Sequence, residues 1–466
     1  MGERVVTRTA GLPPLPPGFE LVLDADTVEL AGGDLLGGEP RRMLRLTPAG
    51  RRLLGELREG PVRSAAAGTL ARRLVTAGVA HPRPPADRER LAVTAVVPVK
   101  DRVHDLDRCL ASLTGTRAVV VDDGSDDAAG VAAVAARHRA RLVVRERTGG
   151  PAAARNSGLA VVDTDLVAFL DSDCVAPPGW LDGLTAHFAD PAVGAVAPRV
   201  VPREPGRSTL GRYAAVRSPL DLGPREALVR PGGRVSYVPT AALVVRRSAL
   251  RGFDEELRYG EDVDAAWRLV DAGWQVRYDP SVTVAHTEPA TWRGFLARRF
   301  RYGTSAGPLA RRHPDRLAPV VLRPWPTAVA ALLVARRPLL AAGAAAVATA
   351  QLARRLDRAG APTELAPRMT AQAVAGTLRG VGRATTQLAL PVAAAAALVA
   401  RRPGMLAALV AAPALEEWWR RLPPLDPIRW TLASIADDVA YGAGVWRGAL
   451  KAGTAAPLLP GRGGQP

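Results

Sequence analysis

A chain of 466 residues is long enough for two or three domains, each with its own core. Its apolar content of 48% and charged content of 23% exclude a chain that is disordered or fibrous throughout. The formal net charge of +17 favours anionic partners such as phosphate groups or acidic lipid surfaces, unless the arginine excess only reflects coding bias. Zinc-finger spacing, an aromatic RNA-binding signature and a basic heptad arm are all missing from the sequence, so no nucleic-acid partner is predicted.

The first 85 residues predict a small winged-helix-like α+β module, the first of three domains. Residues 19–30 alternate like a short hairpin or strand pair, Thr47-Pro48 gives a helix start, and a second helix is expected over 64–77 with Gly78 as its stop. The run 81–85 is rich in proline and is interpreted as a linker. Residues 1–17 contain no long apolar run of the signal-peptide kind, so we expect a cytoplasmic location.

The second domain, 91–313, alternates short apolar β-rich runs with helical stretches. This pattern predicts a buried, mainly parallel sheet of the Rossmann-like α/β class. In such sheets ligands bind at the carboxyl ends of the strands. The predicted strands are 92–98, 118–121, 142–145 and 166–170, and the predicted helices are 106–114, 127–139 and 152–161.

The third domain, 314–466, is rich in alanine and leucine and is predicted to be helical. Its apolar stretches 328–350 and 388–415 are interrupted by arginine pairs, and a central arginine costs about 2.5 kcal/mol or more on insertion. We therefore expect no clean transmembrane helix. Amphipathic helices lying on a membrane and a buried helical bundle remain equally open.

Polar loops follow three of the predicted strands, and the loop with Asp171-Ser172-Asp173 is the most specific indication of a functional site. Residues two apart in an extended chain project to the same side, so both carboxylates can converge on one point. Two carboxylates with phosphate oxygens suit a hard divalent cation, Mg²⁺ or Mn²⁺, whereas the alternative interpretation is a plain acidic turn. His286, after a strand expected at 281–285, is a further candidate metal ligand or a satisfied core histidine.

The remaining candidates fit the binding of a nucleotide. Asp122-Asp123-Gly124-Ser125 is either a turn or an acceptor for a nucleobase and ribose. Gly149-Gly150-Pro151 opens a helix whose start and Arg155 can donate to a phosphate or ribose. The candidate nucleotide-binding residues from these and neighbouring loops are Pro98, Val99, Asp101, Arg102, Asp122, Asp123, Gly150, Arg155, Asn156 and Asp171.

Gly260-Glu261-Asp262 opens another predicted helix, and its acidic first turn either complements the helix dipole or carries catalysis. In the catalytic interpretation, Asp262 is the general base that takes the proton of an acceptor hydroxyl, with Glu261 beside it. Downstream, Arg299 and Tyr302 within 298–303 either clamp a diphosphate or lie on a solvated helix face.

Together these motifs resemble the inverting family 2 glycosyltransferases of the GT-A fold. The residues that carry the resemblance are Val96-Val97-Pro98-Val99-Lys100-Asp101-Arg102, Asp122-Asp123-Gly124-Ser125, Asp171-Ser172-Asp173 and Gly260-Glu261-Asp262. The resemblance covers residues 91–303. It implies a UDP- or GDP-sugar donor, Asp122 or Asp123 near the base, Asp171 and Asp173 at the metal and ribose, Asp262 as base, and inversion in a single displacement.

The N-terminal module and Gly149-Gly150-Pro151-Ala152-Ala153-Ala154-Arg155-Asn156 are similar to the branch of that family in mycofactocin biosynthesis. That resemblance implies a peptide-derived redox cofactor as acceptor, glucose as the sugar, and a module that holds the peptide by strand addition. A clear Gln-x-x-Arg-Trp element is missing, which leaves processivity open. Two alternatives are a membrane-facing transferase that makes a glycolipid or polysaccharide, and a non-catalytic scaffold that binds a peptide.

Overall fold

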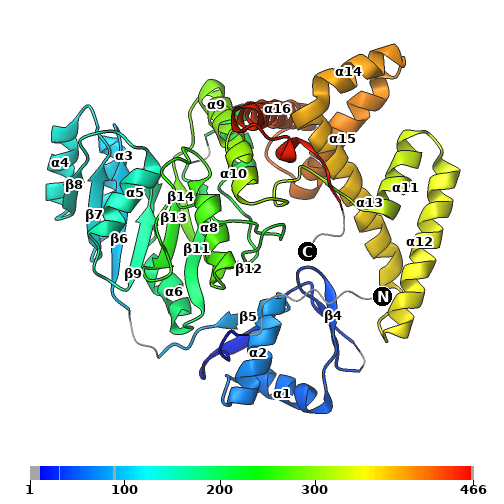
Figure 1. The fold of residues 1–466 in the computed structure, drawn as a ribbon, viewed down its shortest axis with the longest axis horizontal. Coiled ribbons are helices and arrows are strands. Elements are labelled where there is room, and N and C mark those ends of the chain that lie inside the picture. Colours follow the sequence, from blue (N-terminus) through cyan, green and yellow to red (C-terminus); the bar gives the residue numbers. More distant parts are fainter. Residues whose placement is uncertain (1–10, 31, 88–90, 205, 463–466) are drawn as a thin grey trace. The chain divides into compact units, whose positions relative to one another are not determined.

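The computed structural model describes residues 11–30, 32–87, 91–204 and 206–462, so the first ten residues of the predicted N-terminal domain lie outside it. The chain forms two compact units (Figure 1). Unit 1 consists of Met1–Glu204 and Ser218–Thr287, and unit 2 consists of Pro205–Arg217 and Glu288–Pro466. The described residues of unit 1 form three hydrophobic core clusters, one in its N-terminal module and one on each face of a large sheet.

The N-terminal module is an α+β structure, as predicted. Its two helices begin where the sequence indicates, because the side chains of Thr47 and Ser64 accept hydrogen bonds from the backbone of their first turns. Gly78 ends the second helix in the left-handed conformation, with φ of 71°. The elements are β1 (Glu20–Leu23), β2 (Val28–Glu29), β3 (Leu35–Gly37), β4 (Arg42–Leu44), α1 (Pro48–Glu59), α2 (Ala65–Ala77) and β5 (Ala80–Arg83).

Two local predictions for this module are wrong. The expected linker begins inside β5, which pairs antiparallel with β1. Pro82 is tolerated there because β5 has a partner on one side only, and proline is compatible with such an edge strand. The expected hairpin over 19–30 also does not form, since β1 pairs with β5 while β2 pairs with β3. Alternation along the chain indicates strands, but it does not say which strands pair.

Residues 91–204 and 218–287 contain a mixed nine-stranded sheet in the order β10-β14-β11-β13-β9-β6-β7-β8, with β12 beside β14. Strands β9, β6, β7 and β8 run parallel, as predicted, whereas β13 lies antiparallel between β9 and β11. The strands are β6 (Val93–Val99), β7 (Arg117–Asp122), β8 (Arg141–Val144), β9 (Leu166–Leu170), β10 (Cys174–Val175), β11 (Val193–Pro202), β12 (Ala227–Leu228), β13 (Ala242–Arg246) and β14 (Gln275–His286).

Helices cover both faces of this sheet, because successive side chains of its buried strands point to opposite sides. One face packs against α3 (Val103–Ala111), α4 (Ala128–Arg137) and α6 (Trp180–Ala186). The other packs against α5 (Pro151–Ala160) and α8 (Glu261–Asp271). The result is the layered α/β architecture predicted from the alternation of apolar runs and helical stretches.

Unit 2 is mainly helical, as the alanine-rich composition predicts (Figure 1). Its short strands β15 (Val321–Leu322) and β16 (Gly461–Arg462) pair in parallel. Tyr213, Phe295 and Trp430 lie in its aromatic core. Among the described residues, no helix is both long and apolar enough to cross a membrane. The helices are α7 (Thr209–Arg217), α9 (Trp292–Gly303), α10 (Ala306–Arg312), α11 (Pro324–Val334), α12 (Pro338–Arg358), α13 (Leu365–Ala384), α14 (Leu390–Val399), α15 (Pro403–Arg421) and α16 (Pro427–Ala452), with the π-helical turn η2 (Thr385–Ala389).

Helix α16 packs unusually close to its neighbours in unit 2 because glycines line the contact. A Cβ atom at Gly303 would overlap the carbonyl oxygen of Tyr441, and one at Gly444 would overlap that of Phe300. At Gly448 a Cβ atom would meet the carbonyl of Thr304 in the same way. These backbones therefore touch directly, with no side chain between them.

Candidate active site

The carboxyl ends of β7, β6 and β9 lie side by side, because the three strands are parallel neighbours in the sheet. Val99 at the end of β6 is opposite Asp122 at the end of β7, and Val96 of β6 is opposite Phe169 of β9. The loops that follow these strands carry Asp101, Asp123 and the Asp171-Ser172-Asp173 run, so the structure brings the acidic loops to one edge of the sheet.

Arg155 of α5 ties this edge to α8. Its side chain is buried and donates from Nη1 to Oε1 of Glu261 at 2.8 Å and from Nη2 to Oδ1 of Asp171 at 2.7 Å. Burial works against the charged form, but the carboxylates of Asp171 and Glu261 outweigh it and raise the pKa of Arg155. The guanidinium also lies over the ring of Phe253, 5.7 Å from its centroid. One fixed positive charge thus holds two carboxylates from different elements.

Asp173 is held as a carboxylate by two basic groups. It pairs with Arg102, and its Oδ2 lies 3.5 Å from Nε2 of His286 at the end of β14. Burial alone would raise the pKa of Asp173, but the hydrogen bond and charge of His286, with the charge of Arg102, lower it to about 2. Asp173 is therefore ionised near neutral pH.

The pKa of Asp262 is shifted in the opposite direction from that of Asp173. Asp262 lies half-buried in the first turn of α8, two residues after the left-handed Gly260, and its Oδ1 accepts from the backbone N–H of Val263 at 2.8 Å. Desolvation and the charge of the neighbouring Glu261 raise the pKa of Asp262 to about 7. A carboxyl that titrates near neutral pH can both take up and release a proton there, which is what a general base requires.

Asp123 organises the loop that opens α5. Its Oδ1 accepts from Nε of Arg145 at 2.8 Å and from the N–H of Gly149 at 2.9 Å, and its Oδ2 accepts from the N–H of Gly150 at 2.7 Å. Gly150 has φ of 87°, a conformation that side chains disfavour. The neighbouring Asp122 caps its own loop by accepting from the N–H of Ser125. A role of Asp122 or Asp123 at a nucleoside stays a prediction.

The other candidates from unit 1 serve mainly to position loops. The side chain of Asn156 accepts a hydrogen bond from the N–H of Phe253 and donates one to the carbonyl oxygen of Phe253. It therefore fixes the segment that leads towards α8. Asp101 accepts from the N–H of Asp126, and the carbonyl of Val99 accepts from the N–H of Asp123. The half-buried Pro98 precedes Val99 within β6.

Arg299 and Tyr302 belong to α9 of unit 2. Arg299 pairs with Asp437 of α16, and its guanidinium lies 5.1 Å from the ring centroid of Tyr441. Asp437 also accepts from the hydroxyl of Tyr213 at 3.0 Å. The guanidinium of Arg299 is therefore engaged within the helical core, and its predicted contact with a diphosphate stays a prediction, as does that of Tyr302.

Sequence reasoning missed two contributors to the site. Arg145 directly follows β8, the fourth parallel strand, so the strand-end rule that singled out the acidic loops also identifies it. Phe253, which faces Arg155, lies in a segment between β13 and α8 and has no comparable signal in the sequence. Within the described parts of the chain, no group of three His, Cys, Asp or Glu side chains is arranged to hold a metal ion.

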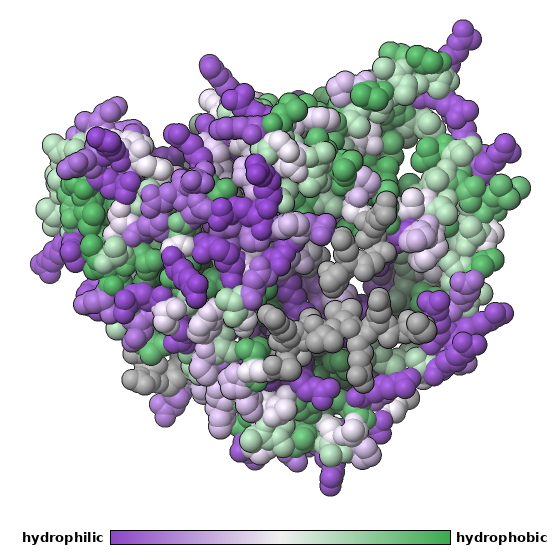
Figure 2. All heavy atoms as spheres, in the orientation of Figure 1, coloured by the Kyte–Doolittle hydropathy of each residue, from purple (hydrophilic) through white to green (hydrophobic). Residues whose placement is uncertain are grey.

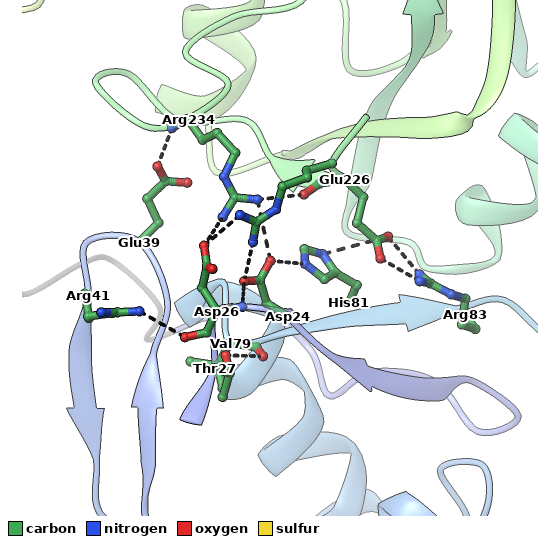
Figure 3. A network of polar contacts seen from close by, with 11 residues as sticks. Asp24, Asp26, Thr27, Glu39, Arg41, Val79, His81, Arg83, Glu226 and Arg234 are labelled. Atoms are coloured by element: carbon green, nitrogen blue, oxygen red, sulfur yellow. Dashed lines mark hydrogen bonds and ion pairs between the residues drawn. The ribbon is translucent and has the colours of Figure 1, made fainter. Parts of the chain in front are cut away.

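The N-terminal module is joined to the sheet domain of unit 1 by buried charges. Arg72 of α2 donates to both carboxylate oxygens of Asp190, each at 2.6 Å, and both side chains are buried. Figure 3 shows a second network, in which His81 lies 3.0 Å from Asp24 and Arg83 makes a two-point contact with Glu226 beside β12. Burial lowers the pKa of His81, which favours the neutral ring.

Comparisons with known proteins show to which family the chain belongs. Residues 94–253 match the family described as glycosyl transferase family 2. The chain is 41% identical to the pre-mycofactocin glycosyltransferase of Mycobacterium tuberculosis, over 96% of this chain and 98% of that protein. It is 26% identical to the glycosyltransferase AglE of Haloferax volcanii, over 45% of this chain and 71% of that one. A solved mannosyltransferase of Pyrobaculum calidifontis is 21% identical, with a TM-score of 0.38 over 72% of this chain and 88% of that one.

The chain therefore belongs to the family 2 glycosyltransferases. Within that family it is of the pre-mycofactocin type, since it matches the Mycobacterium tuberculosis protein over nearly its whole length, N-terminal module and helical region included.

Proposed function

We propose that this protein transfers a hexose, glucose, from a UDP- or GDP-sugar to a hydroxyl group of a mycofactocin-type, peptide-derived cofactor precursor in the cytoplasm. The observation that carries the proposal is the arrangement at the sheet edge, where Arg155 joins Asp171 to Glu261 next to a carboxyl of raised pKa, Asp262. The acceptor class comes from the name of the relative that matches nearly the whole chain.

The chemistry assigned to Asp262 is proton removal. The acceptor oxygen attacks the anomeric carbon as the bond to the diphosphate breaks, the nucleoside diphosphate leaves with the bonding electrons, and Asp262 takes the hydroxyl proton. A single displacement of this kind inverts the anomeric configuration. Desolvation and the neighbouring carboxylate of Glu261, which accepts from Arg155, raise the pKa of Asp262 and so make it a stronger base.

Asp171 and Asp173 are the residues that would hold a divalent cation, Mg²⁺ or Mn²⁺. The donor set fits, because two carboxylates are hard oxygen ligands and Asp173 is ionised at low pH. A cation there would stabilise the negative charge of the departing diphosphate. Since the described residues offer no third acidic or histidine ligand in one group, the donor phosphates and water would complete the coordination. His286 would act by orienting Asp173.

The peptide part of the acceptor is assigned to the N-terminal module. Its strand β4 (Arg42–Leu44) is an outer strand of a three-stranded sheet, and an extended peptide can add to such an edge through backbone hydrogen bonds. The proposal predicts that peptide-linked acceptors are used better than free sugar acceptors.

The test is an assay with purified full-length protein, a panel of UDP- and GDP-hexoses, the peptide-derived acceptor, and Mg²⁺, Mn²⁺ or a chelator. We expect one glucose donor to be consumed, activity to require the metal, and NMR of the product to show the anomeric configuration opposite to that of the donor. Retained configuration would disprove the displacement. Peptide binding without any donor turnover would favour the non-catalytic scaffold instead.

A further inference from the structure

Two helix hairpins of unit 2 have the same six-residue sequence at the turn between their helices. Leu-Val-Ala-Arg-Arg-Pro occurs at 333–338, between α11 and α12, and again at 398–403, between α14 and α15. The two turns also have the same backbone, because Arg336 and Arg401 are both left-handed, with φ of 58° and 53°. In each turn the following arginine donates its N–H across the turn to the last helical residues. We call the residues 333–340 and 398–405 the two hairpin tips.

The hairpin tips expose large apolar side chains next to their arginine pairs. Leu339 and Val399 are each 87% exposed, and Leu340 and Leu398 are exposed as well. Figure 1 places both tips at the upper right of the view, and Figure 2 shows hydrophobic and hydrophilic residues side by side there. Apolar side chains gathered at protruding turns, with cations around them, mark an interaction surface.

Charge decides which partner this surface fits. The sequence contains no aspartate or glutamate between Asp315 and Asp357, nor between Glu364 and Glu416, so both hairpin tips carry arginine as their only charged residue. An exposed surface of leucine, valine and arginine without acids matches the boundary between acyl chains and anionic headgroups of a bilayer. Because no described helix is long and apolar enough to span a bilayer, the match is to its surface.

We propose that the two hairpin tips dock the enzyme on the surface of a membrane that contains anionic phospholipid. The apolar side chains enter the headgroup boundary, the guanidinium groups bind the lipid phosphates, and the two tips act together as a two-point contact. The proposal does not depend on the identity of the sugar or the acceptor. The residues involved are Leu339, Leu340, Leu398 and Val399 in the lipid, and Arg336, Arg337, Arg401 and Arg402 on the phosphates.

The test is sedimentation of the full-length protein with vesicles of phosphatidylcholine alone or of phosphatidylcholine mixed with phosphatidylglycerol. We expect binding to the mixed vesicles, weaker binding to the neutral ones, and release by salt. Each juxtamembrane arginine contributes about fivefold in affinity, so R401Q/R402Q is expected to weaken binding roughly 25-fold. L339S/L340S is expected to weaken binding to the mixed vesicles while the salt dependence remains.

The matched control is R354Q/R355Q, which removes the same charge from exposed positions of α12. These arginines lie roughly 24 Å along the helix from the tip, at 1.5 Å per residue, so their loss is expected to leave binding within a few-fold of wild type. The proposal is overturned if the control weakens binding as much as the tip variants, if neutral and anionic vesicles bind equally, or if neither binds. A dimer in solution that the tip variants dissociate would assign the tips to self-association instead. The melting temperature of each variant checks that it is folded.

Discussion

The guanidinium of Arg155 shows how much one residue can organise in a site of this kind. It is buried and contacts carboxylates from β9's loop and from α8, which are far apart in the sequence. An ammonium group on a flexible stem cannot make both contacts in a fixed plane, so lysine is a poor substitute at this position. The planar fork thereby sets the distance between Asp171 and Glu261.

We expect Arg155→Lys to lower kcat/KM by roughly 10²-fold, since a small misplacement of catalytic groups has that effect. Steady-state kinetics with the sugar donor is the measurement. Arg117→Lys is the matched control, because Arg117 is exposed at the opposite end of its strand, and it should behave as wild type. Equal losses in both variants would mean that the substitution acts through general stability.

Asp262 gives a pH dependence with a definite sign. Its folded-state pKa is raised to about 7, and a base works only when deprotonated, so kcat should rise with pH and level off above about 7. Asp262→Asn should lower kcat about 10²–10⁴-fold with little change in donor affinity, and should remove this inflection. If the variant weakens donor binding and keeps kcat, Asp262 is not the base.

At the scale of elements, the Gly149-Gly150 loop joins Asp123 to the start of α5. Gly150→Ala places a side chain at φ of 87°, where it meets no neighbouring atom within 4 Å, so the effect is confined to the backbone. Such strain is about 1–3 kcal/mol. We expect a lower melting temperature and a raised KM for the donor.

Gly115→Ala is the control for Gly150→Ala. Gly115 has φ of 79°, likewise has nothing within 4 Å, and lies in the turn before β7, at the end of the sheet opposite the site. It should lose a similar amount of stability with the donor KM unchanged. A raised KM in both variants would argue against a specific role of the Gly150 loop.

How well the sequence predicts such elements depends on how far apart in the sequence their interacting residues lie. The parallel strands from β6 to β9 and their helices were predicted to within three residues, because continuous apolar runs and caps are local signals. The partner of β1 could not be predicted, since β5 lies about 60 residues away and contains Pro82. The same limit applies to the pairing of Arg155 with Glu261, for which the sequence gives the residues but not the contact.

At the scale of the whole molecule, the N-terminal module is held to the sheet domain of unit 1 by the Arg72–Asp190 pair. Removing one partner of a buried ion pair leaves a charge without compensation, at a cost of about 3–5 kcal/mol. We therefore expect Arg72→Met to lower the free energy of unfolding by about that amount in urea denaturation. Arg58→Met, which removes an exposed pair with Glu29, should cost less than about 1 kcal/mol.

This attachment also changes what a truncation can reveal. Deleting residues 1–85 leaves Asp190 without Arg72, so a general loss of stability is expected in addition to any loss of peptide binding. Substitutions on the outer strand β4 are therefore the better test of acceptor recognition. They should reduce the use of a peptide-linked acceptor while donor hydrolysis stays near the wild-type rate.

The glycine contacts of α16 limit the amino-acid substitutions that unit 2 can accept. Where two backbones touch, even a methyl group is too large, whereas the exposed hairpin tips have no such steric limit. In a saturation mutagenesis scan read out by abundance in cells, Gly303, Gly444 and Gly448 should therefore form a narrow intolerant strip. The arginine-bearing turns, by contrast, should accept most polar replacements.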